Sequence, residues 1–307
     1  MSEGGGLTAP LAAPSRIEWL TLWLILGCYA GWALALFGLS TVSGPLAVVA
    51  LAVVIAFHSS LSHEAIHGHP FPSERLNAVL MAPALALIVP YARFRDTHLA
   101  HHRDEHLTDP YDDPESNYLD PTRWAGLSQP VQVLLRANNT LVGRLLLGPV
   151  IGTLFWLRGD VAAIRAGDGV VIAGWLAHFP ALALVLGVVW LSPLSLGAYA
   201  LAAYLGLSLL KIRTFLEHRA HEKARARTVI IEDRGPLALL FLNNNLHVVH
   251  HMHPKVPWHS LPALYHANRD HYLRRNEGYR YRSYAEVFRL HFLRSKDPVP
   301  HPLWPRD

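Results

Sequence analysis

The sequence predicts an all-α integral membrane protein with four transmembrane helices in two hairpins, interfacial helices and a cytoplasmic helical cap that carries clusters of histidine. Only 16% of the 307 residues are charged, against about 25% in a typical soluble domain. Four apolar segments approach the roughly 20 residues that a hydrocarbon core of about 30 Å requires. The turns that join these segments in pairs contain no charged residue. A soluble helical protein with a large apolar core is the alternative, and two charge-free hairpins argue against it.

The predicted spans cover residues 19–39 and 45–61 in the first hairpin, and residues 170–191 and 194–210 in the second. All 27 Lys and Arg residues lie outside the spans and the hairpin tips, so they fall on one side of the membrane. By the positive-inside rule that side is the cytoplasm. We therefore expect both termini and any site built near the basic segments to be cytoplasmic.

The rest of the chain divides around these spans. Residues 1–15 are rich in Gly, Ala and Pro and are expected to form a flexible tail without a cleavable signal peptide, whereas residues 16–307 form a single domain that ends in a cap over residues 211–307. Residues 78–91 are apolar but short and interrupted by proline, which predicts a re-entrant or interfacial helix. Residues 145–157 are expected to lie along the membrane surface.

Histidines cluster at the cytoplasmic ends of the apolar segments. The clusters have the patterns HxxxH, HxxHH and HxxHH, with one further histidine after the fourth span. Residues three or four apart share a face of a helix, so the imidazoles of one cluster can point to the same metal ion. The members are His63 and His67; His98, His101 and His102; His218; and His247, His250 and His251. Their common level relative to the membrane predicts a shared metal centre, whereas His58, His178 and His301 are expected to be isolated surface residues.

Several metals and uses are compatible with these clusters. Cys28 is the single cysteine, which excludes a disulfide framework and a thiolate site. Imidazole binds iron, copper, zinc and nickel, and HEAIH at residues 63–67 also matches a zinc metalloprotease signature with Glu64 as general base. Such a protease would leave both HxxHH clusters unused. A structural metal is a third alternative, but four ligands suffice for one. The excess of histidine therefore favours two metal ions.

The order HxxxH, HxxHH, HxxHH, interleaved with two helical hairpins, resembles the membrane fatty acid desaturase superfamily, which includes hydroxylases and carotenoid ketolases. The segment FLEH at residues 215–218 resembles the additional histidine motif of the alkane hydroxylases. Residues 243–262, NNNLHVVHHMHPKVPWHSLP, are similar to the third cluster of bacterial desaturases and carotenoid ketolases. The resemblance covers roughly residues 45–264.

The resemblance implies a non-haem centre of two iron ions that uses O2 as co-substrate. Its ligands here would be the nine histidines His63, His67, His98, His101, His102, His218, His247, His250 and His251. His221 is a weaker substitute for His218, and His253 and His259 are expected beside the ligands or on the surface. The acidic residues 109–115 and Glu217 are candidates for orienting ligand imidazoles, which usually donate their second N–H to such groups. A solvated loop is the other interpretation of the acidic run.

The implied activity is that of an oxidoreductase that attacks an aliphatic C–H bond of a lipid. Fatty acyl desaturation is the first expectation, and hydroxylation or ketolation of a hydrocarbon or carotenoid is the alternative. The sequence has no cysteine cluster, dinucleotide-binding glycine motif or haem motif, so an external ferredoxin- or rubredoxin-like donor with its reductase is required. Arg219, Lys223, Arg225 and Arg227 are candidates for its docking site, or for contact with anionic lipids. We expect a bacterial inner-membrane location and no nucleic-acid partner.

Overall fold

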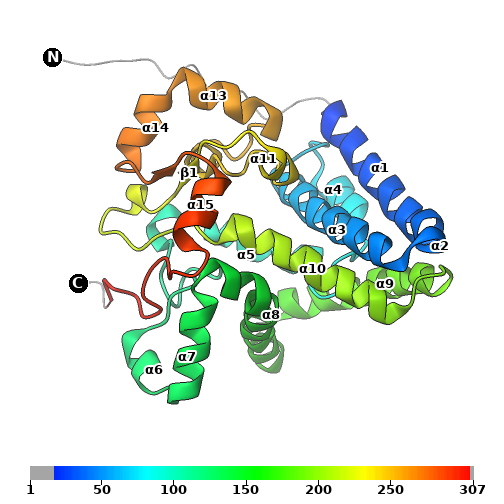
Figure 1. Cartoon of the computed structure of the whole chain (residues 1–307), viewed down its shortest axis with the longest axis horizontal. Coiled ribbons are helices and arrows are strands. Elements are labelled where there is room, and N and C mark those ends of the chain that lie inside the picture. Colours follow the sequence, from blue (N-terminus) through cyan, green and yellow to red (C-terminus); the bar gives the residue numbers. More distant parts are fainter. Residues whose placement is uncertain (1–16, 305–307) are drawn as a thin grey trace.

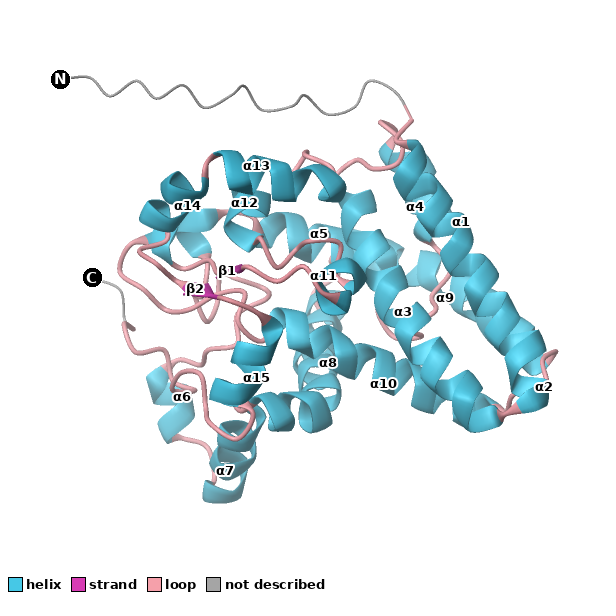
Figure 2. Cartoon of the chain, turned by 45° about the horizontal axis from the view of Figure 1, so that its top comes forward, coloured by secondary structure: helices cyan, strands magenta, loops and turns pink. Residues whose placement is uncertain are grey.

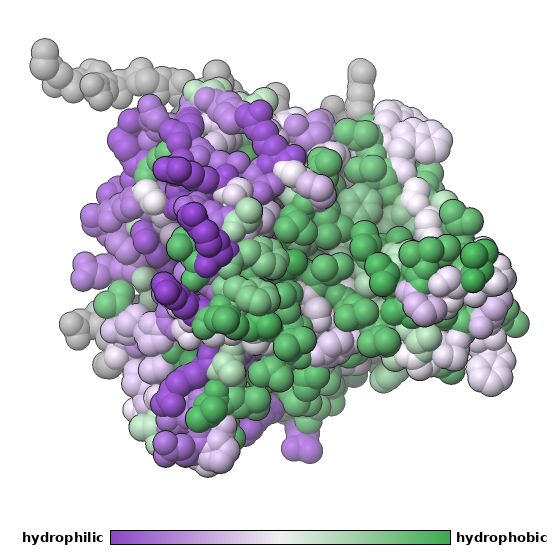
Figure 3. All heavy atoms as spheres, viewed as in Figure 1, coloured by the Kyte–Doolittle hydropathy of each residue, from purple (hydrophilic) through white to green (hydrophobic). Residues whose placement is uncertain are grey.

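The computed structural model of the protein describes residues 17–304, so the predicted tail over residues 1–15 lies outside the described part. Within it the chain is predominantly helical, and long helices form a bundle beside a cap of short helices and loops (Figure 1). The two strands, Ile230–Ile231 (β1) and Arg280–Tyr281 (β2), pair in parallel inside the cap. Apolar residues dominate the surface of the bundle and polar residues that of the cap, as a membrane protein requires (Figure 3).

The first hairpin consists of α1 (Trp19–Leu34) and α3 (Gly44–Ile66). The π-helical segment η1 (Ala35–Leu39) and α2 (Ser40–Val42) continue α1, so the predicted turn is mostly helical. The hydroxyl of Thr41 donates back to the carbonyl of Gly38 at 2.7 Å, which keeps this segment in the helix. Ser43 then caps α3. Helix α3 extends beyond residue 61, where the predicted span ends. It contains His63, and His67 caps its C-terminus.

The second hairpin consists of α9 (Gly169–Trp190) and α10 (Leu196–Thr214), close to the predicted limits. The Asp168 side chain caps α9 and accepts from the N–H of Val170 at 2.9 Å. Ser195 caps α10 in the same way. Each helix therefore starts at a residue whose side chain satisfies N–H groups that have no partner within the helix.

Five described helices are long and apolar enough to cross a membrane, one more than predicted: Trp19–Val42, Gly44–Ile66, Leu141–Arg165, Gly169–Trp190 and Leu196–Thr214. The additional one, α8 (Leu141–Arg165), contains the predicted surface segment. Near its start, the N–H of Val142 bonds the carbonyl of Phe292 in the cap at 3.0 Å. Towards its end, Asp160 pairs with Arg93 of α5 (Tyr91–His101), the helix that carries the second histidine cluster. α8 thus lies crosswise to α10 at the cap end of the bundle (Figure 1).

Residues 78–91 do not form one helix. The helix α4 (Glu74–Met81) ends there, and an irregular segment over residues 82–90 leads into α5. Pro83 and Pro90 interrupt helical hydrogen bonding, since proline has no N–H to donate. The carbonyl of Leu85 accepts from the Tyr199 hydroxyl, and that of Leu87 from His178, both at 2.9 Å. Irregular backbone among apolar helices is tolerated where side chains satisfy it in this way.

The expectation that His58, His178 and His301 are surface residues is wrong. Their exposed fractions are 6%, 4% and 3%. His58 lies 3.1 Å from the Tyr29 hydroxyl, and His301 lies 3.2 Å from Thr108 Oγ1. Each imidazole therefore has a polar partner inside the protein, which the sequence spacing does not reveal.

The cap surrounds β1 and β2 with short helices joined by loops (Figure 2). Its segments come from both the middle and the end of the chain. They are η2 (Asp104–His106), α6 (Pro121–Ala125), α7 (Gln129–Asn138), η3 (Ala224–Ala226), α11 (Pro236–Leu240), α12 (His247–Met252), η4 (Trp258–Ser260), α13 (Leu261–Ala267), α14 (Arg269–Arg275) and α15 (Tyr284–His291). The predicted cap thus also receives residues that precede the second hairpin.

Helices α3 and α10 pack closely because Gly206 has no side chain. A Cβ at Gly206 would lie 2.9 Å from the carbonyl oxygen of Ala52, whereas one at Gly197 on the same helix would meet open space. We expect Gly206→Ala to destabilise the protein by about 1–3 kcal/mol through overpacking. Gly197→Ala is the control, since it adds the same methyl group to the same helix at a position with open space. Thermal unfolding in detergent measures the difference, and equal stability of the two variants would contradict this packing.

Candidate metal centre

Three helix ends bring the predicted ligands together. His63 lies in the last turn of α3, and His67 is its C-terminal cap. Gly68 follows with a φ of 97°, a left-handed conformation that favours glycine and ends the helix directly after His67. His98 and His101 lie in the last turn of α5, while α12 begins at His247. His218 follows the end of α10.

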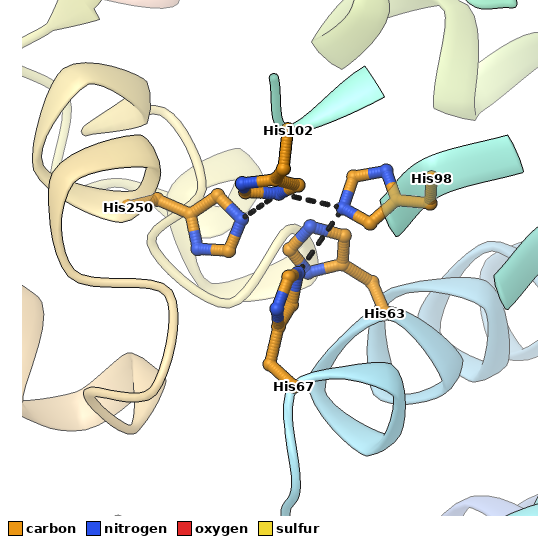
Figure 4. A group of neighbouring side chains, drawn as sticks. All are labelled: His63, His67, His98, His102 and His250. Carbon is orange, nitrogen blue, oxygen red and sulfur yellow. Dashed lines mark hydrogen bonds between the residues drawn. The ribbon is translucent and has the colours of Figure 1, made fainter. Parts of the chain in front are cut away.

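The structure brings all nine predicted histidines into two adjacent groups. In each group one nitrogen from every residue lies within 4.8 Å of those of the others. The first group is His63, His67, His98, His102 and His250, and the second is His101, His218, His247 and His251. The rings of the first group turn toward one another from three segments of the chain (Figure 4). The groups adjoin where the rings of His102 and His251 stack, with centroids 4.3 Å apart.

Distances between the ring nitrogens suit metal coordination. In the first group, His98 Nε2 lies 3.1 Å from His67 Nε2 and 3.0 Å from His102 Nε2. In the second, His218 Nε2 lies 2.9 Å from His101 Nε2 and 3.1 Å from His247 Nε2. Two ligands at right angles on an ion, each with a metal–nitrogen bond of about 2.1 Å, are separated by about 3.0 Å. The spacing therefore fits several imidazoles that share one ion.

The partners of the other ring nitrogens point to the same conclusion. His98 Nδ1 donates to Glu115 at 3.0 Å, and His101 Nδ1 donates to Asp113 at 2.8 Å. Because an ionised carboxylate only accepts, the proton of each neutral ring is on Nδ1, and its Nε2 presents a lone pair to the group. His247 Nδ1 likewise donates to Asn244, and His218 Nε2, which faces the Nε2 lone pairs of both His101 and His247, can donate a proton to only one of them. The donor set therefore fits a metal ion in each group.

Electrostatics keeps most of these imidazoles neutral. Burial, together with the neighbouring imidazoles, holds the pKa of His247 and His250 well below its ordinary value. His101 differs: burial lowers its pKa, but the carboxylates of Glu115 and Asp113 outweigh that effect and raise the pKa to about 9. The two carboxylates thus favour a positive charge at His101, from a proton or a metal ion. His63 Nε2 is buried with no hydrogen-bond partner among the described residues.

The acidic run does contact the ligands, as one of its two interpretations predicts. Asp113 is held in place by the N–H of Thr108 at 2.8 Å. Glu217 pairs with Arg213 at 3.1 Å and lies 4.0 Å from His247 Nδ1. Asn244 also contacts a predicted ligand, although the histidine patterns do not identify it: its side-chain oxygen accepts from His247 Nδ1 at 3.0 Å. The run of asparagines before the third cluster was the available signal.

Other histidines remain outside both groups. His221 lies 3.4 Å from Glu277, so it does not replace His218. His259 lies 3.4 Å from Glu18, and His253 packs edge-on against Tyr272. These positions agree with the expectation for His253 and His259.

The proposed basic docking patch is partly wrong. Arg227 is buried and donates to the carbonyl of Leu107 at 2.9 Å, so it is not available to a partner protein. Arg219 lies over the ring of Tyr279 at 4.4 Å. Lys223 and Arg225 are exposed. The sequence alone does not distinguish these roles, because arginine serves both as a surface charge and as a donor to buried carbonyls.

A cavity of about 910 Å³ lies next to the histidine groups. It is enclosed by α3, α5, α8, α9 and α10, together with residues 108–119. His218 lines it directly, as do the carboxylates of Asp113, Glu115 and Glu217. Its volume is in the range of small-molecule binding sites. A substrate in this cavity would therefore lie beside the candidate metal centre.

Residues 39–283 match the family model described as fatty acid desaturase. The chain belongs to this family. A beta-carotene ketolase from Paracoccus sp. (strain N81106 / MBIC 01143) is 27% identical over 256 residues, which cover 80% of this chain and 88% of the ketolase. A beta-carotene ketolase from Paracoccus sp. (strain PC1) is 29% identical over 269 residues, or 84% of this chain and 90% of the ketolase.

The match makes this desaturase-family protein an oxidoreductase of the desaturase and ketolase type. It gives no support to the zinc protease alternative. Glu64, the base that such a protease would need, is buried and accepts from the N–H of Trp258 at 3.2 Å. That hydrogen bond connects the first histidine cluster to Trp258, in the segment that follows the third histidine cluster.

Proposed function

We propose that this protein oxidises an aliphatic C–H bond of a membrane lipid, with O2 as co-substrate and two iron ions bound by the nine histidines. The observation that carries the proposal is the pair of histidine groups, with Nε2 atoms 2.9–3.1 Å apart, beside a cavity at the cap end of the apolar bundle. Iron bound there would supply the redox chemistry that reduces O2 and cleaves a C–H bond. The first candidate reaction is fatty acyl desaturation.

The desaturation balances with an external reductant. Adjacent CH2 groups each lose one hydrogen, and O2 receives these hydrogens plus two electrons and two protons to give two molecules of water. The residues of this chain hold the imidazoles in place, and the carboxylates of Asp113 and Glu115 keep the Nδ1 protons of His101 and His98 in position. The electrons come from a separate protein, since the sequence has no redox motif of its own.

Ketolation is the second candidate, supported by the two ketolase relatives. It converts one CH2 to C=O in two rounds, each consuming O2, two electrons and two protons. Whether the protein desaturates or ketolates its substrate depends on which C–H bonds the cavity holds near the metal centre.

The electron donor is proposed to dock over His251. This half-buried residue lines a shallow pocket together with Arg225, Met252 and Arg275. From a donor docked there, electrons would travel only a short distance to His251, a candidate metal ligand. The arginines would attract an acidic electron carrier.

Reversing the charge of Arg225 is expected to slow turnover. With an acidic ferredoxin as donor, Arg225→Glu should lower the rate several-fold at low salt, because rim charges steer association. The effect should shrink as salt is raised. Lys255→Glu, at another exposed position in the cap, is the control. An equal loss with dithionite as electron source would show that the change acts on the centre rather than on docking.

Lipid analysis of cells tests the proposed function. Expression of the protein in a host that lacks desaturases is expected to produce unsaturated acyl chains, and the His250→Ala variant is expected to produce none. A host that accumulates β-carotene tests the second candidate through the appearance of keto groups. If neither host shows oxidised product while purified protein holds its metal and a reductase is supplied, the proposed function is wrong.

A further inference from the structure

An irregular segment over residues 296–301, which we call the strap, follows α15 and is drawn in red in Figure 1. It lies beyond the residue at which the match to the family model ends. It nevertheless runs beside the loop over residues 108–120, which contains the carboxylates that orient His98 and His101. The N–H of Leu119 in this loop donates to the carbonyl of Val299 at 3.0 Å. The strap is therefore attached to the loop through its backbone.

Lys296 connects the strap to His218, a predicted ligand of the second histidine group. Its side chain is 10% exposed, and its ammonium group donates to the backbone carbonyl of His218. The ammonium group also lies 3.5 Å from the carboxylate of Asp297, which accepts from the Tyr118 hydroxyl. The same hydroxyl accepts from the N–H of Ala220 at 2.9 Å. The chain around His218 is thus held against the strap at two points.

His218 is the one predicted ligand that neither lies in a helix nor caps one. Within a helix, hydrogen bonds to the neighbouring turns fix the backbone that carries a ligand. His218 has instead an isolated bridge to Thr228 and the donor from Lys296. The position of its imidazole therefore depends on contacts from distant parts of the chain.

A second connection runs from the strap to His101, a ligand of the same group. His301 Nε2 lies 3.2 Å from Thr108 Oγ1, and the N–H of Thr108 donates to Asp113 at 2.8 Å. Asp113 in turn accepts from His101 Nδ1 at 2.8 Å. Both connections from the strap thus end at ligands of the second group, His101 and His218.

We propose that the strap positions the second histidine group, with Lys296 as the positioning residue that holds His218 in place. The inference rests on the metal centre of the proposed function and assigns a further segment to it. Lys296 acts on the metal ion only through His218, so its loss should weaken binding without removing a ligand. Residues that orient metal ligands typically contribute about 10–100-fold to metal affinity. The ion of the second group should therefore be lost before that of the first.

Iron retention tests this for the two ions separately. Full-length, detergent-purified protein is loaded with iron and exposed to increasing concentrations of chelator, and the iron left per chain is measured. In Lys296→Met, which has no donor, one ion should leave at a chelator concentration at least about tenfold lower than in the wild type. The other ion should keep the wild-type profile. Lys296→Arg, which keeps a charged donor, should restore most of the retention.

Lys223→Met is the matched control. Lys223 lies in the same cap, but its ammonium group pairs with Glu277 at 2.6 Å, outside both histidine groups. Its chelator profile should equal that of the wild type. If Lys296→Met does not fold in thermal unfolding experiments, His301→Ala interrupts the second connection instead and should also release one ion first.

Other outcomes separate the inference from the proposed function. Release of both ions in parallel would show that the strap only stabilises the fold, and would overturn the inference. A Lys296→Met profile equal to that of the wild type, in protein that oxidises lipid, would overturn the inference alone. Selective loss of one ion in Lys296→Met, when the iron-loaded wild type with reductant oxidises no lipid, would support the inference and contradict the proposed function.

Discussion

Replacing His98 by alanine is expected to lower substrate oxidation by at least about a hundredfold. His98 Nε2 lies close to both His67 Nε2 and His102 Nε2, so it occupies the middle of the first group. Loss of a residue that only orients a metal ligand typically costs about 10–100-fold, and loss of the ligand itself should cost no less. The measurement is turnover of purified protein with saturating reductant, with thermal unfolding recorded in parallel to confirm that the variant folds.

His221→Ala is the matched control for this prediction. His221 lies three residues after a predicted ligand but contacts Glu277 instead of either histidine group. Its removal should leave turnover within about twofold, as for most substitutions away from a site. If His98→Ala folds and remains fully active, or if both variants lose activity equally, the assignment of the first group is incorrect.

Replacing Glu115 by alanine is expected to weaken metal binding by about 10–100-fold without abolishing it. Glu115 accepts from His98 Nδ1 at 3.0 Å and lies 3.9 Å from His101 Nε2, so it acts on both groups. Its loss removes the acceptor that keeps the His98 proton on Nδ1. Iron retained at increasing chelator concentrations measures the effect.

Asp112→Ala controls for the charge of the loop. Asp112 belongs to the same acidic run, but its side chain is 65% exposed and its nearest histidine is His106, outside both groups. We expect the wild-type chelator profile for this variant. A Glu115→Ala profile that coincides with that of Asp112→Ala would show that Glu115 belongs to a solvated loop with no role at the centre.

The sequence predicts much of the candidate centre because histidine spacing reports helix geometry directly. Imidazoles three or four residues apart must share a helix face, and all nine predicted residues lie in the two groups. The apolar segments likewise predict both hairpins. The predicted ends of the spans are less accurate. Helix α3 continues through His63, because a helix does not have to end where its apolar residues end.

Features that depend on long-range packing could not be read from the sequence. His58 and His178 look like isolated surface residues, yet Tyr29 and the Leu87 carbonyl provide partners from distant segments. The contact of Asn244 with His247 depends on the local turn before α12. The cavity, with Lys211 beside the glycines of α8, arises only when five helices assemble.

The metal content of the detergent-purified protein tests the central claim most directly. We predict about two iron ions per chain, as a two-metal centre requires, and a reduced content in the His250→Ala variant. Mass spectrometry of the metal, normalised to protein by amino-acid analysis, gives both values. About one zinc ion per chain, unaffected by the removal of His250, would contradict the di-iron account.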